Sequence, residues 1–373
     1  MNAQTRNIPV LNGIRALAIA IVFASHASNI FFNGALTGFG GGQLGVMLFF
    51  VLSGFLMACL YMERPATVSA QRDFVVNRLA RIYPMFFVVV AGCFIIRVSA
   101  AALWVYPIDT WHELFEHLGF VRGYEVLWTI GAEVIFYVLF LVLWKTRNAG
   151  PTSLFIGMVA AMVFAAWVPL DIKGNNSVIN LHDKLPYFIL GCLLGMRSEL
   201  ILSVDPVGHK AAATAAFWIS LLAYVASLPQ ILRLAIPLPR EFLAHPDVMA
   251  WASPFYLVAT TALFVTAVRA RPWILTNKAA VFIGKISFSF YLLHYMVLEN
   301  VRTVMPTHPL RSIALALMVT MVLSALSYAT VEVPMRNWIR RIGSGRRKEK
   351  GIPKQSLPDD HPMPVSPAIS DNR

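Results

Sequence analysis

An arginine and a histidine stand eleven residues apart in the apolar stretch RALAIAIVFASH, as Arg15 and His26. In a helix, eleven steps of about 100° bring both side chains to nearly the same face, roughly 16 Å apart along the axis. A histidine can take the proton from a hydroxyl as a general base, and an arginine can bind phosphate. A simpler interpretation also fits, in which Arg15 is an anchor at a membrane surface and His26 is a core histidine whose hydrogen bonds are satisfied.

Three further ionisable residues lie in apolar stretches, namely Glu133 in LWTIGAEVIFY, His294 in SFSFYLLHYM, and Arg97. Counted from the ends of their stretches, all three reach about the depth of His26, in the outer half of a membrane. Charged groups at such depths are rare and usually face a bundle interior, where they mark a pathway or a site. We therefore expect these four groups to form a buried polar site, with a structural ion-pair network as the alternative.

Such a site supports the transfer of an acyl group to a hydroxyl. His26 would take the proton of the attacking hydroxyl, and the Glu133 carboxylate would orient the imidazole and stabilise its cation. The sequence has no GxSxG motif, and its three cysteines lie in apolar stretches as small hydrophobic residues. Direct transfer is therefore favoured over a covalent acyl-enzyme. No HExxH, Rossmann or P-loop pattern is present, and no metal is expected.

The elements that must position these residues are membrane helices. Of the 373 residues, 57% are hydrophobic and 13% are charged, whereas about 25% are charged in soluble domains. The apolar residues form blocks of about 20, the length of a helix that crosses a bilayer. We predict an all-α fold, a polytopic transmembrane helical bundle of about ten spans. The expected spans are 10–32, 44–62, 82–102, 126–144, 153–170, 185–202, 211–232, 250–268, 280–300 and 312–332.

The distribution of basic residues predicts the orientation of the bundle. The loop 63–81 carries four arginines, whereas the loop 33–43 carries no basic residue. Because lysine and arginine accumulate in cytoplasmic loops, we expect both termini in the cytoplasm. The net charge of +12 then reflects topology, and no nucleic-acid partner is expected. Residues 1–342 form the membrane domain, and residues 343–373 form a polar, proline-rich, disordered cytoplasmic tail.

These motifs resemble the membrane-bound acyltransferase 3 family, whose members acylate O-antigens, exopolysaccharides and nodulation lipo-oligosaccharides. The matching stretches run in order along the chain: LNGIRALAIAIVFASH, GVMLFFVLSGFLM, NRLARIYP, LWTIGAEVIFY, GKISFSFYLLHY and SYATVEVPMR. One stretch alone is weak, but six in order on a ten-span frame are specific. The resemblance implies an acyltransferase that binds no permanent cofactor and uses an acyl-CoA, such as acetyl-CoA, as co-substrate.

The resemblance also implies roles for single residues. His26 is the expected catalytic base, with Glu133 beside it, and donor binding is expected from Arg15, Arg78 and Arg81. The residues expected to line the site are Ser53, Gly54, Phe55, Trp128, Arg97 and His294. Arg97 is included only because of its estimated depth in the membrane. Glu332 matches a later signature position without an assigned role. Asn12 stands where the family usually has aspartate, so no carboxylate is expected there.

We expect a multi-pass protein of a bacterial inner membrane that moves an acyl group, with acetyl favoured, from acyl-CoA to a sugar hydroxyl. The acceptor would be a cell-surface glycan or a lipo-oligosaccharide. The sequence contains no esterase-like C-terminal domain of the kind that many O-antigen acetylases carry, so it resembles stand-alone members. Two other functions stay open: a transporter or flippase whose intramembrane charges form a pathway, and a sensor or scaffold without chemistry.

Overall fold

The structure is a computed structural model that describes residues 8–38, 40–99, 102–167, 171–173, 178–180, 184–203, 210–228, 230–232 and 254–343. Helices form almost all of its regular structure. Those of the first half are α1 (Pro9–Phe32), α2 (Gly42–Met57), η2 (Ala58–Met62), α3 (Val68–Val98), α4 (Trp111–Leu118), η3 (Glu125–Leu127), α5 (Trp128–Asn148) and α6 (Pro151–Trp167). Those of the second half are α7 (Leu185–Met196), α8 (Ser198–Leu202), α9 (Lys210–Ala226), α12 (Pro254–Ala270), α13 (Trp273–Thr276), α14 (Lys278–Val304), α15 (Pro309–Ser327), η6 (Tyr328–Glu332) and α16 (Val333–Gly343).

A short hairpin provides the two strands among the described residues. The strands β1 (Asp171–Lys173) and β2 (Val178–Asn180) pair antiparallel, with Ile172 opposite Ile179. The helical class predicted from the apolar blocks is confirmed, because every expected span falls on a helix.

Six helical segments among the described residues are long and apolar enough to cross a membrane. They are Pro9–Phe32, Gly42–Met62, Val68–Val98, Glu125–Asn148, Lys278–Val304 and Pro309–Gly343. The shorter apolar helices are Pro151–Ala161, Leu185–Met196, Lys210–Ala226 and Pro254–Ala270. The chain is therefore a multi-pass membrane protein, while the count of ten crossings and the cytoplasmic termini stay predictions. The expected tail lies outside the described residues apart from Gly343.

The third long helix begins earlier than the sequence predicted. Residues 68–81, expected in a loop, form the first turns of α3 because Thr67 caps them, its hydroxyl accepting a hydrogen bond from the Ala70 N–H at 3.2 Å. Pro84 lies inside this helix, as neighbouring helices in a membrane bundle allow. Arg78 and Arg81 therefore stand on a helix, one turn apart and on the same face.

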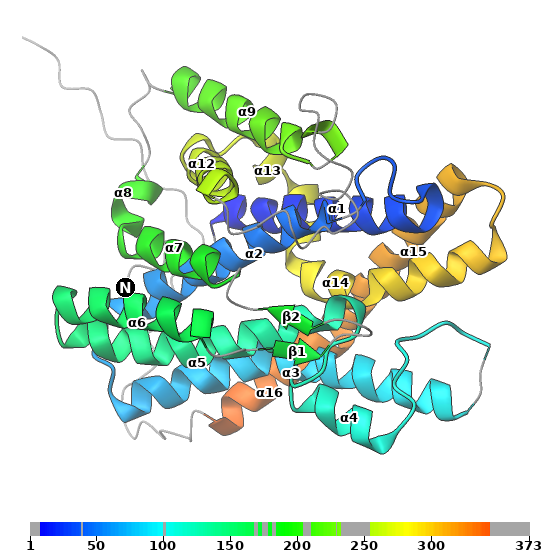
Figure 1. The fold of residues 1–373 in the computed structure, drawn as a ribbon, viewed down its shortest axis with the longest axis horizontal. Coiled ribbons are helices and arrows are strands. Elements are labelled where there is room, and N and C mark those ends of the chain that lie inside the picture. Colours follow the sequence, from blue (N-terminus) through cyan, green and yellow to red (C-terminus); the bar gives the residue numbers. More distant parts are fainter. Residues whose placement is uncertain are drawn as a thin grey trace, which may run out of the picture.

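Helix α1 packs against α2 and α14, α2 packs against α7, and α14 packs against α15. In the view of Figure 1, α9 and α12 lie on one side of α1 and α2, and α3, α5 and α6 lie on the other. Helices from distant parts of the sequence thus surround the N-terminal pair, and their facing sides make one continuous apolar core.

Glycines bring α2 and α7 into close contact. A Cβ added at Gly54 would lie 2.2 Å from the Phe188 carbonyl oxygen, and one at Gly191 would lie 2.2 Å from the Val51 carbonyl oxygen. Small residues at a helix interface let two backbones approach closely within a membrane. This packing fixes the rotation of α2, and so decides which of its residues face the interior.

Candidate functional site

Two neighbouring cavities that share lining residues lie among α1, α2, α3, α5 and α14. The inner chamber is lined by apolar residues together with a few polar ones, chiefly Arg15, Ser53, Arg78, Arg81, Glu133 and Tyr291. The second cavity, the basic vestibule, is lined chiefly by Asn12, Arg15, Tyr61, Arg64, Arg78, Arg81 and Arg340. Arg15, Arg78 and Arg81 line both cavities, and the boundary that they form between the two is named the passage.

The carboxylate of the inner chamber belongs to Glu133. Its Oε1 accepts a hydrogen bond from the Ser53 hydroxyl at 3.1 Å and another from the Tyr137 hydroxyl at 2.5 Å. Tyr137 lies one turn further along α5 than Glu133, and Ser53 belongs to α2. A short bond from a hydroxyl to an ionised oxygen is among the stronger hydrogen bonds in proteins. The chamber therefore has one anchored acceptor facing its arginines.

Arg78 is the most enclosed cation of this region. It is only 8% exposed, and its Nε–H has no hydrogen-bond partner among the described residues. Its guanidinium carbon lies 5.5 to 5.8 Å from the centroids of three aromatic rings, those of Phe74, Tyr137 and Tyr61. Cation–π contacts help to hold a buried charge, but they leave its N–H groups available to an anion.

Arg15 reaches the passage from α1. Its Nη1 donates to the Oδ1 of Asn12 at 3.1 Å, so the amide at the position where the family usually has aspartate still orients the guanidinium. The three arginines predicted to bind a donor are therefore brought together, with Arg81 beside the other two in both cavities.

The three residues of the SGF element point in different directions, as steps of about 100° require. Ser53 faces the inner chamber, Gly54 meets α7, and the Phe55 ring packs against Phe264 of α12 at 5.1 Å between centroids. Only Ser53 therefore lines the site, and the other two residues position it. Trp128 likewise packs on the α2 core, with its ring 6.4 Å from that of Phe50.

His26 and His294 form a pair next to the inner chamber, although 268 positions separate them in the sequence. Their ring centroids are 5.2 Å apart, and the Tyr295 ring meets that of His26 edge-on at 5.0 Å. His294 is fully buried. Its Nδ1–H donates to the carbonyls of Phe290 and Tyr291 at 3.1 and 2.8 Å, which leaves Nε2 as the acceptor. That atom has no hydrogen-bond partner among the described residues.

Tyr291 connects the chamber to the histidine pair. Its side chain lines the inner chamber, and its ring centroid lies 5.8 Å from that of His294. His26 itself makes no hydrogen bond or ring contact with Glu133 among the described residues. The expected pairing of these two groups is therefore replaced by two neighbouring centres, one around Glu133 and one around His26.

Arg97 does not reach either centre, which corrects the expectation that it lines the site. It lies one residue before the end of α3, its side chain is 42% exposed, and its Nε donates to Asp109 Oδ1 at 2.6 Å. The depth estimate failed because a partner beyond the helix end draws the long side chain outward. Glu332 is not among the residues that line either cavity; it accepts a hydrogen bond from the Ser289 hydroxyl and joins η6 to α14.

The sequence argument missed three residues on the far side of His26, namely Tyr295, Glu125 and Asn300. The Tyr295 hydroxyl is hydrogen-bonded to Glu125, the first residue of η3. The backbone of Glu125 is left-handed, with a φ of 47°. The Trp104 ring centroid lies 5.4 Å from that of Tyr295. The Asn300 side chain accepts a hydrogen bond from the Trp104 N–H at 2.9 Å and donates one to the Trp104 carbonyl at 2.7 Å. A strained residue and an aromatic cluster beside a half-buried histidine are features of a functional site.

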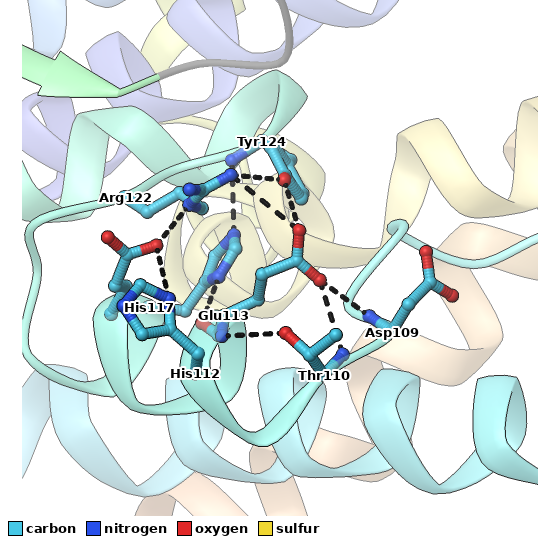
Figure 2. Close-up of polar contacts among 8 residues, drawn as sticks. Asp109, Thr110, His112, Glu113, His117, Arg122 and Tyr124 are labelled. Atoms are coloured by element: carbon cyan, nitrogen blue, oxygen red, sulfur yellow. Dashed lines mark hydrogen bonds and ion pairs between the residues drawn. The ribbon is translucent and has the colours of Figure 1, made fainter.

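Helix α4 clamps this region from outside the bundle (Figure 2). The His117 Nδ1–H donates to the Glu113 carbonyl at 2.7 Å, and its Nε2 accepts the Tyr124 N–H at 3.4 Å. The Tyr124 hydroxyl donates to Glu113 Oε1 at 2.8 Å, and Arg122 donates to that hydroxyl at 2.5 Å. Burial lowers the pKa of His117, so the ring is neutral. The clamp fixes the residue that precedes Glu125.

The chain is similar to a known protein family over most of its length. A family model described as an acyltransferase domain, that of acyltransferase family 3, matches residues 8–329. The chain belongs to the acyltransferase 3 family. The match covers α1 to α15 and therefore every residue described above at the inner chamber and the histidine pair, whereas α16 lies beyond it.

Relatives of the chain are found in Staphylococcus aureus. The O-acetyltransferase OatA of strain NCTC 8325 / PS 47 is 24% identical over 377 residues, covering 89% of this chain and 57% of the relative. The protein SACOL0978 of strain COL is 26% identical over 368 residues, covering 89% and 58%. This acyltransferase 3 chain thus spans a little over half the length of these relatives. No solved structure matches it.

Proposed function

We propose that the chain is a membrane O-acyltransferase that moves an acyl group, acetyl in the first instance, from acyl-CoA to a sugar hydroxyl of a cell-surface glycan or glycolipid. The observation that carries the proposal is that Arg15, Arg78 and Arg81 line both a basic vestibule and a mostly apolar chamber beside two histidines. Family membership and a relative named as an O-acetyltransferase support the same reaction.

The donor is proposed to enter through the vestibule. Its phosphates would bind the arginines of the passage, because guanidinium groups match phosphate oxygens in geometry and charge. Its thin pantetheine arm would extend through the inner chamber past Tyr291. The distance along α1 from Arg15 to His26, roughly 16 Å, is suited to such an arm. In the predicted orientation the vestibule opens to the cytoplasm, where acyl-CoA is made.

His26 is proposed as the general base. As the acceptor oxygen attacks the thioester carbonyl, its proton passes to an imidazole nitrogen of His26, the new C–O bond forms, and the C–S bond then breaks. The proton leaves the imidazolium for the CoA sulfur, so the enzyme is unchanged. His294 lies beside His26, with the two ring centroids 5.2 Å apart, and is proposed to help position the His26 ring.

Glu133 is proposed to act on the donor side rather than beside His26. Its carboxylate offsets part of the charge of the arginine passage and holds Ser53 and Tyr137 in place. A cluster of arginines with one anchored carboxylate keeps its geometry when no anion is bound. On the other side, the aromatic residues around Tyr295 form the surface on which a sugar ring would stack.

Mass spectrometry of surface glycans tests the proposal in cells of a bacterium that carries this chain. Cells lacking the protein would be complemented with wild type, with His26→Ala, or with His112→Ala at equal membrane abundance. His112 is a matched control because its side chain is 77% exposed. We expect one acyl mass increment to return with wild type and with the control only. Equal glycan masses in all strains would contradict acyl transfer, and full restoration by His26→Ala would remove His26 from catalysis.

A further inference from the structure

The last described helix, α16, contributes one residue, Arg340, to the wall of the basic vestibule. It packs along α3, and Arg340 lines the vestibule with Arg64 and Arg78. The residues matched by the family model end at 329, so Arg340 comes from a part of the chain that the family match leaves out.

The vestibule has a strong imbalance of charge. Its described lining carries five arginines and a single acidic residue, Asp73. The Nε–H of Arg78 is buried without a hydrogen-bond partner among the described residues, and such a donor costs free energy until an acceptor reaches it. These features fit a ligand with several anionic oxygens rather than a neutral one.

An aromatic ring lies among these cations. The guanidinium carbons of Arg64 and Arg78 are 5.6 and 5.8 Å from the centroid of the Tyr61 ring. Tyr61 belongs to the π-helical segment η2, and Arg64 follows it with its carbonyl held by the Trp144 Nε1–H at 2.7 Å. Tyr61 and Arg64 line the vestibule but not the inner chamber, whereas Arg78 lines both. A fixed backbone therefore places an aromatic surface and the Arg64 guanidinium in the part of the vestibule outside the inner chamber.

We propose that Arg340 and Arg64 bind the phosphate groups at the nucleotide end of the donor, so that α16 is part of the donor site. This inference rests on the proposed function, because it assigns the far end of the acyl-CoA molecule. The other face of α16 presents the exposed apolar residues Met335, Trp338 and Ile342, which are suited to a membrane surface. The helix is thereby held at the interface with Arg340 directed into the cavity.

Binding of CoA and of 4′-phosphopantetheine, which lacks the adenosine phosphates, tests this assignment. The full chain would be purified in detergent and titrated by calorimetry as wild type, Arg340→Gln and Arg341→Gln. Arg341 is the matched control, because it neighbours Arg340 and is not among the described lining residues. We expect Arg340→Gln to weaken CoA binding about tenfold or more, with phosphopantetheine binding unchanged and the control equal to wild type. Arg340→Lys should recover part of the loss, which separates charge from folding.

The outcomes distinguish the inference from the proposed function. If wild type binds CoA and Arg340→Gln binds it equally well, α16 is not part of the donor site and the proposed function stands. Equal weakening of both ligands by Arg340→Gln would also overturn the assignment to the nucleotide end. If wild type binds no CoA, both the inference and the acyl-CoA donor are wrong.

Discussion

The hydrogen bond between Tyr137 and Glu133 provides a quantitative test of the inner chamber. The hydroxyl donates to the carboxylate oxygen at 2.5 Å, and Tyr137 is 6% exposed. In Glu133→Leu this hydroxyl stays buried without its acceptor. In Tyr137→Phe the carboxylate loses one donor but keeps Ser53. A double-mutant cycle between the two positions therefore isolates the energy of this contact.

The structure sets the size of the expected coupling. A hydrogen bond to a charged group contributes about 1.5–3 kcal/mol, and the short O···O distance is typical of a charge-assisted bond. We expect a coupling energy in that range, with Tyr137→Phe destabilising in the wild-type background and nearly neutral in the Glu133→Leu background. Ser53→Ala should cost less, about 1 kcal/mol or under, because its bond is longer at 3.1 Å and neutral serine can bond its own helix.

Unfolding in mixed detergent micelles, followed by tryptophan fluorescence, measures these free energies for the four members of the cycle. The Ser53→Ala variant serves as the control for removal of a hydroxyl from the same carboxylate. A coupling below about 0.5 kcal/mol would mean that the two substitutions act independently. That result would refute the interpretation of Glu133 as an anchored acceptor.

Three further predictions follow from packing, protonation and exposure. Gly54→Ala should lower the free energy of unfolding by about 3 kcal/mol or more, measured as above, because a Cβ there would lie 2.2 Å from a backbone oxygen of α7. Gly92→Ala is the control, since open space surrounds Gly92, and equal effects of the two substitutions would contradict the α2–α7 packing. Burial lowers the pKa of His117, so the unfolded chain binds a proton at a higher pH than the folded chain does. The Tm should therefore fall as the pH drops below about 6.5, and it should fall less in His117→Gln. Parallel pH profiles of the two proteins would exclude the α4 hydrogen-bond cluster as described. Arg97→Gln should change acyl transfer less than about twofold, because its guanidinium binds the exposed Asp109; a tenfold loss would return Arg97 to the site.

Most of the fold could be predicted from the sequence because a bilayer leaves few alternatives to a helix. Each apolar block of about 20 residues has to form its hydrogen bonds internally, and every expected span falls on a helix. The start of α3 was missed because the positive charges of residues 68–81 indicated a loop, whereas Thr67 provides a cap. Hydropathy gives the apolar length of a helix but not its extension into the polar region.

The site was harder to predict because a residue count gives depth but not direction. Depth placed Glu133, His26 and His294 at one level, yet rotation about the helix axes puts the carboxylate in the arginine-lined chamber and leaves the histidines together. Such rotation is set by helix contacts such as those of Gly54 and Gly191, which act between distant parts of the chain. The family motif was a better guide to Arg78 and Arg81, since both arginines that it assigned to donor binding line the same two cavities.

Glu125 and Arg340 had no sequence signal that pointed to a site. Glu125 is placed by a left-handed backbone conformation, which its residue type does not favour. Arg340 lies in a basic stretch whose simplest interpretation is topology, and only its packing against α3 brings it to the vestibule. Both depend on contacts that one sequence does not reveal.

Transfer by the purified protein tests the central claim most directly. The full chain in liposomes would receive radiolabelled acetyl-CoA together with glycan isolated from cells that lack the protein, and label in the glycan would be followed over time. We predict transfer by wild type and a loss of about 10²- to 10⁴-fold in His26→Gln, with CoA affinity unchanged. Transfer at the wild-type rate by His26→Gln, with CoA bound equally well, would contradict the account.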